Sequence, residues 1–253
     1  MFVWGGEWPE RRVAAAIVGS RAATPYGLAI ADRLARDLAM HGVVVMSGLA
    51  RGIDSAAHAG ALAAGGHTAA AIASALDHLT GPQARLAARI ADAGAVLSEV
   101  GEGGPFGRGA FVKRNRLIAA CSAVTVVVEA AEDGGALTTA AVARALGRPV
   151  LAVPGDLDRP ASRGTLALLR SGARVCADAG DVLAAMEPLP AAAGEDAGRR
   201  LLARLGPEPA SVEQLSLACG LAPPETLARL LRLQWSGLAQ PHPGGRWSSR
   251  LAK

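Results

Sequence analysis

The sequence predicts an α/β fold with a doubly wound, mostly parallel sheet, followed by a small helical module. Three observations lead to this prediction. Between residues 13 and 186, short apolar runs alternate with helical patterns of the length found in strand–helix units. Residues 124–128 form an almost continuous β-branched run, which is typical of a strand buried on both faces. At residues 188–198, proline, alanine, glycine and acidic residues dominate, which indicates a linker.

The elements of the first part follow one another as strand–helix units. A first strand is predicted at residues 14–18, followed by a helix at residues 25–40. A second helix is predicted at residues 136–146. The further strands are predicted at residues 43–46, 68–73, 95–97, 124–128 and 150–153. Repeated units of this kind imply parallel strands with right-handed crossovers, and therefore a Rossmann-like domain over residues 1–187.

Residues 199–253, after the linker at 188–198, are predicted to form a second domain. Ser211 and Gln214 have the spacing of a capping box at the start of a helix. Pro224 fits the first position of a second helix, and residues 237–247 fit a hairpin. Helix, turn, helix and hairpin together predict a winged helix, which binds duplex DNA in some proteins and mediates protein contacts in others.

The composition indicates a globular protein, with 51% hydrophobic and 19% charged residues. No apolar run is long enough to span a bilayer, and the first twelve residues lack the pattern of a signal peptide, so no membrane partner is expected. Cys121, Cys176 and Cys219 are scattered without a Cys-x-x-Cys pair. A reduced, cytoplasmic protein without a metal site fits this usage best.

The net charge of +4 is unevenly distributed along the chain. From Arg199 onward there are eight basic and three acidic residues, so the tail carries +5 and the remainder −1. The tail charge favours an acidic partner such as nucleic acid. Because the first part is nearly neutral, any anion site in it must be local.

Four segments are predicted to lie beyond the carboxyl ends of the strands, where open α/β sheets bind ligands. Their small residues would let backbone N–H groups approach an anion, and helix N-termini would add positive potential. None has the spacing Gly-x-Gly-x-x-Gly, so a dinucleotide fingerprint is absent and no cofactor is expected. The four segments are residues 19–21 (Gly-Ser-Arg), 47–54 (Ser-Gly-Leu-Ala-Arg-Gly-Ile-Asp), 113–116 (Lys-Arg-Asn-Arg) and 134–139 (Gly-Gly-Ala-Leu-Thr-Thr).

Several of these residues also have ordinary structural interpretations. The segment 19–21 could be a plain strand-to-helix turn, although Arg21 gains nothing from the dipole of the helix that follows. Asp54 is predicted to be the N-cap of a helix at residues 55–62. His58, one helical turn later, is expected to form a hydrogen bond with Asp54 rather than a catalytic dyad. Glu129 could serve in hydrolysis, or could instead cap a helix or form a salt bridge.

Among the four segments, residues 113–116 give the strongest indication of an anion-binding site. From residue 103 to residue 128 there are four basic residues and no acidic one. We expect the segment to open a helix, where each exposed cation opposes the macrodipole by about 0.3–1 kcal/mol unless an anionic ligand offsets that cost. The ordinary alternative is a solvated charged face. Phe106 and Phe111 flank the stretch and could stack on unpaired bases, although core packing is the commoner role of phenylalanine.

These segments together resemble the DNA-processing protein A (DprA/Smf) family. The resemblance extends over residues 13–176 and, more loosely, over the tail. The stretches that carry it are residues 16–21 (Ala-Ile-Val-Gly-Ser-Arg), 47–54, 57–58 (Ala-His), 65–68 (Gly-Gly-His-Thr), 97–99 (Leu-Ser-Glu), 114–119 (Arg-Asn-Arg-Leu-Ile-Ala), 128–130 (Val-Glu-Ala), 135–140 (Gly-Ala-Leu-Thr-Thr-Ala) and 153–155 (Val-Pro-Gly).

The resemblance implies a non-enzymatic protein that binds single-stranded DNA and loads the RecA recombinase onto incoming strands during natural transformation and recombination. It also implies a homodimer. By the same resemblance, the DNA would be held by the first loop, by the Gly-rich second loop and by the basic segment. The residues expected to bind DNA are Gly19, Ser20, Arg21, Ser47, Gly48, Arg51, Gly52, Lys113, Arg114, Asn115, Arg116, Gly134 and Gly135.

The sequence departs from the family pattern at three places. The helical domain that often precedes the Rossmann-like part is expected to be missing, because the first strand is predicted to begin near Val13. Residues 77–80 (Asp-His-Leu-Thr) stand where the family usually has an Asp followed by Tyr-Pro. Phe111-Val112 replaces the proline common before the basic segment. The last two departures affect the local shape of the loops and the path of the DNA.

Two other functions remain open. Residues 134–138 are similar to the Pro-Gly-Gly-x-Gly-Thr loop of the "lonely guy" nucleotide phosphoribohydrolases. Those enzymes need a glutamate three residues after the threonine, and Ala141 and Val142 occupy the two positions that this count allows. This disfavours the enzyme unless Glu129 has taken over the role. The third function is that of a winged-helix regulator whose α/β domain senses a nucleotide.

Overall fold

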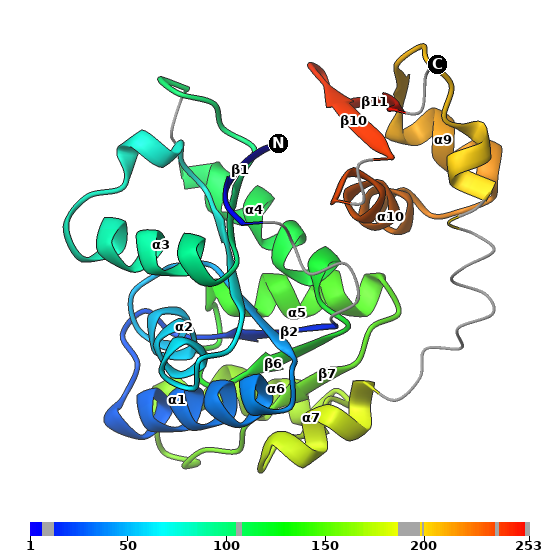
Figure 1. The fold of residues 1–253 in the computed structure, drawn as a ribbon. Helices are drawn as coiled ribbons and strands as arrows, with labels where there is room; N and C mark the ends of the chain where they lie inside the picture. Colours follow the sequence, from blue (N-terminus) through cyan, green and yellow to red (C-terminus); the bar gives the residue numbers. More distant parts are fainter. Residues whose placement is uncertain (7–12, 105–107, 187–197, 199, 236–237, 251–253) are drawn as a thin grey trace. The chain divides into compact units, whose positions relative to one another are not determined.

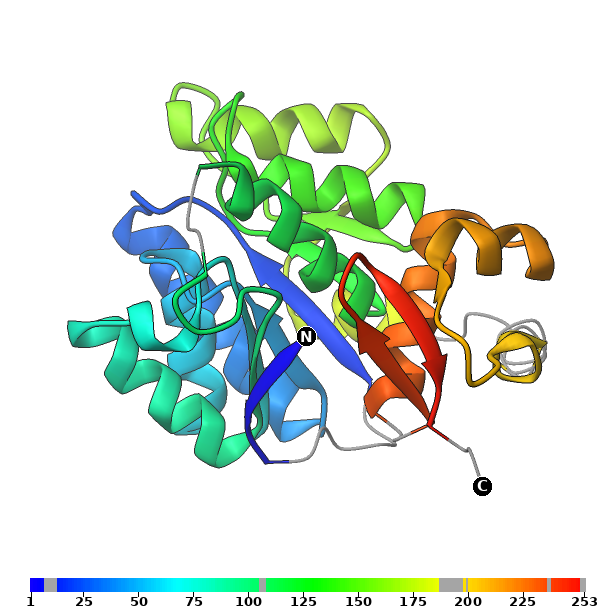
Figure 2. The ribbon, with the colours of Figure 1, turned by 90° about the horizontal axis from the view of Figure 1, so that it is seen from above.

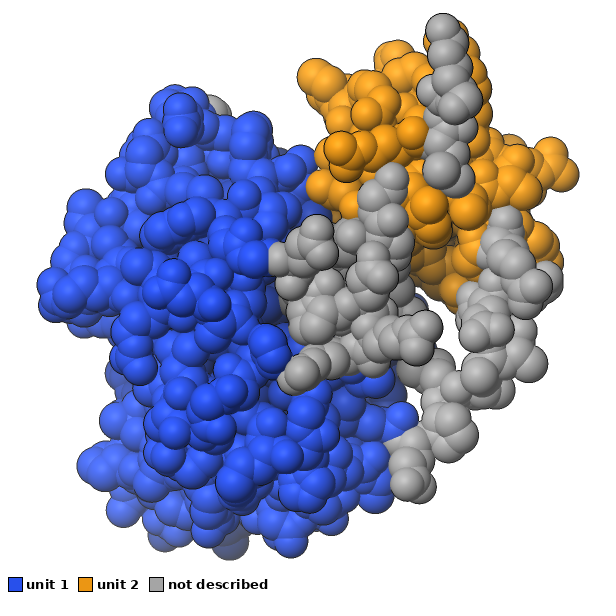
Figure 3. All heavy atoms as spheres, in the orientation of Figure 1, with its two compact units in different colours: residues 1–186 blue, residues 187–253 orange. Residues whose placement is uncertain are grey.

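The computed structural model describes the chain except for residues 7–12, 105–107, 187–197, 199, 236–237 and 251–253. The chain divides into two compact units, residues 1–186 and residues 187–253 (Figure 3). Phe106 and most of the predicted linker lie outside the described residues.

The first unit is built on one eight-stranded sheet with the strand order β1-β5-β4-β3-β2-β6-β7-β8 (Figure 1). Every neighbouring pair is parallel except β1 and β5, which are antiparallel. The doubly wound, mostly parallel sheet predicted from the sequence is therefore confirmed. Its strands are β1 (Phe2–Gly5), β2 (Ala14–Val18), β3 (Val44–Ser47), β4 (Thr68–Ile72), β5 (Ala95–Ser98), β6 (Val124–Val127), β7 (Val150–Ala152) and β8 (Arg174–Val175).

Helices cover both faces of this sheet (Figures 1 and 2). Helices α1, α2 and α7 bury their apolar sides against one core cluster that includes Ile17, Val45 and Val126. Helix α3 covers β4 and β5 around Ile72 and Val96, while α4 and α5 pack together on the other face. The helices are α1 (Pro25–Met40), α2 (Ile53–Ala63), α3 (Gly81–Ala93), α4 (Arg108–Cys121), α5 (Gly135–Ala145), α6 (Arg163–Arg170) and α7 (Ala179–Met186), with short 3-10 turns at Leu76–His78 and Pro160–Ser162.

The expectation that the sheet begins near Val13 is wrong, because β1 precedes it. Phe2 to Gly5 pair with β5 as an antiparallel edge strand. All four residues are exposed, so β1 has no buried face that would leave an alternating apolar pattern in the sequence. The two-residue strand β8 at the other edge was missed for the same reason, since both its residues are exposed.

The second unit has the winged-helix arrangement that the sequence predicts. Its elements are β9 (Ala210–Ser211), α9 (Val212–Cys219), α10 (Pro223–Trp235), β10 (Ala239–His242) and β11 (Arg246–Ser249). The three strands form an antiparallel sheet in the order β10-β11-β9. On α10, Arg229 forms an ion pair of 2.6 Å with Glu225, so part of the positive charge of this helix is neutralised within the helix.

The predicted capping box at the start of α9 is present. The Ser211 hydroxyl accepts from the Gln214 amide at 3.2 Å, and the Gln214 side chain accepts from the Ser211 amide at 2.9 Å. We expect Ser211→Ala to lower the local opening free energy of α9 by about 1 kcal/mol. Native-state hydrogen exchange of the α9 amides measures this change, with the α1 amides as internal control. Unchanged exchange in α9 would contradict the prediction.

Within the described residues, no helix is both long enough and apolar enough to cross a membrane.

Candidate nucleic-acid interface

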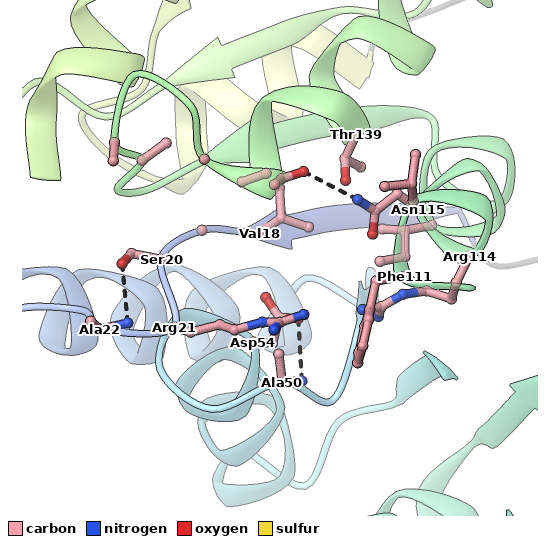
Figure 4. Close-up of a pocket in the computed structure, with 18 residues that line it drawn as sticks. Val18, Ser20, Arg21, Ala22, Ala50, Asp54, Phe111, Arg114, Asn115 and Thr139 are labelled. Carbon is pink, nitrogen blue, oxygen red and sulfur yellow. Dashed lines mark hydrogen bonds between the residues drawn. The ribbon is translucent and has the colours of Figure 1, made fainter. Parts of the chain in front are cut away.

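A hollow lined by predicted site residues lies at the carboxyl edge of the sheet, between β2 and β6 (Figure 4). From β2 the strand order runs through β3 and β4 on one side and through β6 and β7 on the other, so this is the point where the winding reverses. Open α/β sheets bind their ligands at such a switch point. We call this hollow of about 600 Å³ the switch-point cleft. It is lined by residues 18–22, 50, 54, 111–112, 114–115, 118, 130–131, 134–136 and 139.

Two further hollows continue from the switch-point cleft along the same edge. One of about 440 Å³ lies beyond β3 and β4 and shares Arg21, Ala50 and Phe111 with the cleft. The other, of about 410 Å³, lies beyond β4 and β5 and shares Arg114 with the cleft. Because neighbouring hollows share wall residues, the three form one row, which we call the carboxyl-edge groove.

The first loop places a cation against an aromatic ring of α4, at the wall shared by two of the hollows. Gly19 has no room for a side chain, since a Cβ there would lie 2.6 Å from the Ile53 side chain. The Ser20 amide donates to the carbonyl of Glu129 at 2.7 Å, which fixes the turn. The Arg21 guanidinium then lies over the Phe111 ring, 4.5 Å from its centroid (Figure 4). Arg21 remains exposed in this cation–π contact.

Glu129 stabilises the start of α1. Its carboxylate accepts from the Thr24 amide at 2.9 Å and from the Thr24 hydroxyl at 2.5 Å, and Thr24 is the N-cap of α1. The absence of a side chain on Gly27 makes room for this carboxylate, because a Cβ there would lie 2.4 Å from its Cδ. Of the roles that the sequence left open for Glu129, helix capping is therefore the one observed.

The second loop is held by a carboxylate of its own chain. Asp54 accepts from the amides of Gly48 and Ala50 at 3.2 and 3.3 Å. The N-cap of α2 is Gly52, and Asp54 lies inside the first turn, so the predicted N-cap role of Asp54 is wrong. The expectation that this loop turns its amides toward an external anion is also not met at these two positions, because they already hold Asp54.

The backbone of the second loop takes conformations that only particular residues tolerate. Gly52 has φ of +80°, and a Cβ there would lie 2.2 Å from the Ser20 carbonyl oxygen. Leu49 is the one described non-glycine residue with positive φ, at 58°, and its side chain is buried. Gln83 from α3 donates to the Leu49 carbonyl at 3.1 Å. A strained, externally braced loop of this kind is characteristic of functional sites.

A buried pair of opposite charges lies beneath the groove. Arg114 is 5% exposed and Asp54 is 6% exposed. A Cβ at Gly48 would meet both Arg114 Nη1 and Asp54 Oδ2, at 1.7 and 2.6 Å, so the two side chains flank this glycine. Burial raises the pKa of Asp54, and the Arg114 charge opposes that rise. Arg114 also donates to the Ala71 carbonyl at 2.8 Å, which anchors α4 to β4.

The predicted hydrogen bond between His58 and Asp54 is not formed. Its Nδ1 lies 2.7 Å from the Thr68 hydroxyl, and that hydroxyl donates to the Val45 carbonyl. The hydroxyl oxygen must therefore accept from His58, which places the proton on Nδ1 and leaves Nε2 bare. Burial and the nearby Arg114 charge lower the pKa of His58 to about 3.

The basic segment does not open a helix. Helix α4 begins at Arg108, so Lys113 lies in its second turn and the predicted conflict with the macrodipole does not arise. Lys113 is exposed at the hollow beyond β4 and β5. Asn115 donates to the Gly135 carbonyl at 3.1 Å, and Arg116 forms an ion pair with Glu99 at 2.6 Å.

The structure brings most of the expected site residues together at the groove. Ser47, Gly52 and Arg116 do not line any of the three hollows. Ser47 is buried and donates to the Ile17 carbonyl, and Gly52 packs against the Ser20 carbonyl. Gln83 lines the groove but was missed, because nothing in the sequence connects it to a loop 34 residues away. The described residues hold no group of three potential metal ligands.

Comparisons with known proteins agree on one family. Residues 1–187 match the model of DNA recombination-mediator protein A, and residues 185–245 match the DprA winged helix domain. A putative DNA processing protein DprA of Mycobacterium tuberculosis is 43% identical over 249 residues, which cover 92% of this chain. The chain spans 64% of the length of that relative.

Two solved structures are similar to this one. DNA processing protein A of Streptococcus pneumoniae aligns with a TM-score of 0.67 and 36% identity, over 72% of this chain and 65% of that one. The Helicobacter pylori protein, whose structure describes a single-stranded DNA binding mode, aligns with a TM-score of 0.66 and 29% identity, over 73% and 85%. The family model covers the whole sheet and both groove-forming loops. The chain therefore belongs to the DNA recombination-mediator protein A (DprA/Smf) family.

Proposed function

We propose that this protein binds single-stranded DNA along the carboxyl-edge groove, without catalysing a reaction, and loads RecA recombinase onto the strand during recombination and natural transformation. We propose further that it acts as a homodimer in the cytoplasm. The observation that carries the DNA-binding proposal is the continuous row of three hollows with a cation at each. Single-stranded DNA is commonly bound in grooves that combine positive charge with aromatic surfaces.

The charges of the groove fit a strand backbone. Arg21, Arg51 and Lys113 are exposed and line successive hollows, and Phe111 stands beside Arg21. Cations spaced along a narrow groove can neutralise successive phosphates while bases lie on the aromatic ring. The Helicobacter pylori relative, which binds single-stranded DNA, supports the same assignment.

Two carboxylates of the loops at the cleft support a binding role rather than hydrolysis. Glu129 is held by the amide and hydroxyl of Thr24, and Asp54 by two loop amides. A general base has to reach its substrate with a free lone pair at a suitable pKa. Both side chains are instead used to shape the loops, and the two positions that could carry the phosphoribohydrolase glutamate hold Ala141 and Val142.

We expect the double variant Arg21→Ala, Lys113→Ala to bind single-stranded DNA at least tenfold more weakly than wild type at low salt. Each cation that contacts a phosphate contributes about 0.7 to the slope of log K against log salt for single strands. The double variant should therefore lose about 1.4 from that slope. Fluorescence anisotropy of a labelled oligonucleotide over a salt series measures both quantities.

The matched control is the double variant Arg33→Ala, Arg89→Ala. It removes the same net charge from exposed positions of α1 and α3 that do not line the groove. Its slope should equal that of wild type. An equal loss in both double variants would show a general charge effect and refute the proposed site. If an unlabelled duplex competes as well as a single strand, the DNA-binding proposal itself fails.

RecA loading is tested by the rate of RecA filament formation on strands already bound by this protein.

A further inference from the structure

One cation of the carboxyl-edge groove differs in its chemistry from the others. The chain has 24 arginines but two lysines, Lys113 and Lys253. Among the described residues, the exposed cations of the groove are the guanidinium groups of Arg21 and Arg51 and the amine of Lys113. A guanidinium stays protonated in proteins, whereas an amine can lose its proton and act as a nucleophile. Lys113 is therefore the groove cation whose charge a covalent modification can remove.

The amine of Lys113 is not held in an ion pair. Lys113 is exposed at the hollow beyond β4 and β5, and within the described part of the chain its side chain forms no ion pair and no hydrogen bond. Glu99 lines the same hollow but is already paired with Arg116 at 2.6 Å. An adjacent carboxylate would favour the protonated amine, which is not a nucleophile. Pairing Glu99 with Arg116 leaves Lys113 the more reactive.

The preceding turn of α4 leaves room for a reagent beside this amine. Long side chains of a helix lie over the turn on their N-terminal side, which for Lys113 contains Gly109 and Ala110. Both residues line the hollow, and a Cβ at Gly109 would meet no atom within 4 Å. The volume of this hollow, about 410 Å³, is in the range of small-molecule sites. A small acyl donor can therefore approach the Nζ of Lys113.

We propose that Lys113 is an acylation site, at which an acyl phosphate removes one charge of the groove and thereby lowers its affinity for single-stranded DNA. The unprotonated amine attacks the acyl carbon, so that a C–N bond forms and the C–O bond to phosphate breaks. Phosphate leaves with the bonding electrons, and one proton of the amine passes to the solvent. The product is a neutral amide. The effect on DNA rests on the proposed function, whereas the acylation itself does not.

The size of the effect follows from the loss of one phosphate contact. For single strands, each cation that neutralises a phosphate contributes about 0.7 to the slope of log K against log salt. Acylation of Lys113 is expected to remove about 0.7 from this slope and to weaken binding at low salt on the order of threefold. A bound strand should in turn slow the acylation, because its backbone covers the amine.

The test treats the full chain with acetyl phosphate and then removes the reagent, since free phosphate would compete for the groove. Peptide mass spectrometry measures the acylated fraction at Lys113 and at Lys253. Fluorescence anisotropy of a labelled oligonucleotide over a salt series measures affinity and slope before and after treatment. A second treatment, with an excess of unlabelled oligothymidine present, measures how far a strand protects Lys113.

Two charge-conserving variants separate the effects of the two lysines. Lys253→Arg leaves Lys113 as the acylable side chain, and Lys113→Arg leaves Lys253. We expect treatment to weaken strand binding by wild type and by Lys253→Arg to the same extent. Lys113→Arg, whatever its starting affinity, should bind equally before and after treatment. The amino terminus can react in all three proteins, so Lys113→Arg also controls for its contribution.

The outcomes separate this inference from the proposed function. Acylation of Lys113 that a strand slows and that weakens binding in both proteins with this lysine supports the inference. If Lys113 stays unmodified while Lys253 reacts, the modification site is refuted, even when single strands bind well. Unchanged affinity of a protein fully acylated at Lys113, or an equal loss in Lys113→Arg, refutes the control of binding. If the untreated protein binds no strand, the proposed function fails, and the acylated fraction at Lys113 still decides the modification site.

Discussion

Replacing Asp54 with alanine is expected to lower the free energy of unfolding by about 3 kcal/mol. The change removes the acceptor of two loop amides and the opposing charge of Arg114, which stays buried beneath the groove. Each orphaned amide costs about 1 kcal/mol or more, and an uncompensated buried charge costs several. Urea denaturation followed by circular dichroism measures the loss.

The control for Asp54→Ala is Asp92→Ala on the exposed surface of α3. It removes the same charge without a buried partner, so its effect should remain within about 0.5 kcal/mol. If Asp54→Ala were as mild as the control, the two amides and Arg114 would have to find other partners. The electrostatic account of the second loop would then be wrong. Since Arg114 lines the cleft, we also expect Asp54→Ala to weaken binding of single-stranded DNA.

Acid is expected to destabilise the protein through His58. The imidazole is fully buried and neutral, and its pKa is lowered from 6.5 to about 3. In the unfolded chain His58 is protonated below about pH 6.5, whereas in the folded chain it stays neutral down to about pH 3. The stability contributed by the neutral ring is present above pH 6.5 and is lost as the pH falls toward 3. Between pH 7 and pH 5 this loss amounts to about 2 kcal/mol.

The measurement compares wild type with His58→Asn. Asparagine can keep a side-chain N–H for the Thr68 hydroxyl but does not titrate in this range. Other titrating groups act equally in both proteins, so the difference between their unfolding free energies at pH 7 and pH 5 isolates the histidine. Parallel pH dependences of the two proteins would mean that His58 can be protonated in the folded state.

Local patterns in the sequence were enough to predict the central elements. Strand β2 and helix α1 were predicted with the observed bounds, because an apolar run is followed by a helical pattern of apolar residues. Strand β6 was predicted within one residue from its β-branched run. The exposed edge strands β1 and β8 were missed because neither buries a face that would impose a pattern.

The candidate site was harder to predict than the fold, because its loops are shaped by distant residues. Nothing near Thr24 indicates that Glu129 will bond to it, and nothing near Gly48 indicates that Arg114 will lie against it. The start of α4 was misplaced because glycines at positions 101, 103, 104, 107 and 109 resemble a loop, although the helix begins at Arg108 within them. Residue types were enough to propose a site at the carboxyl edge of the sheet, whereas the direction of each amide and charge required the tertiary structure.

The pairing of β2 also determines when the groove is completed during synthesis. On one side β2 pairs with β3, where Ala14 lies beside Val44, but on the other it pairs with β6, where Ala15 lies beside Val124. The first partner, β3, leaves the ribosome soon after β2, whereas the second partner, β6, follows only after β4, β5 and α4. A nascent chain that ends before β6 has the first two loops but lacks Glu129 to set the turn after β2 and the α5 wall of the cleft. Such distant pairing forms late and slowly. If the groove binds DNA as proposed, unfinished chains would not occupy DNA, because the groove is complete only once β6 and α5 have been made.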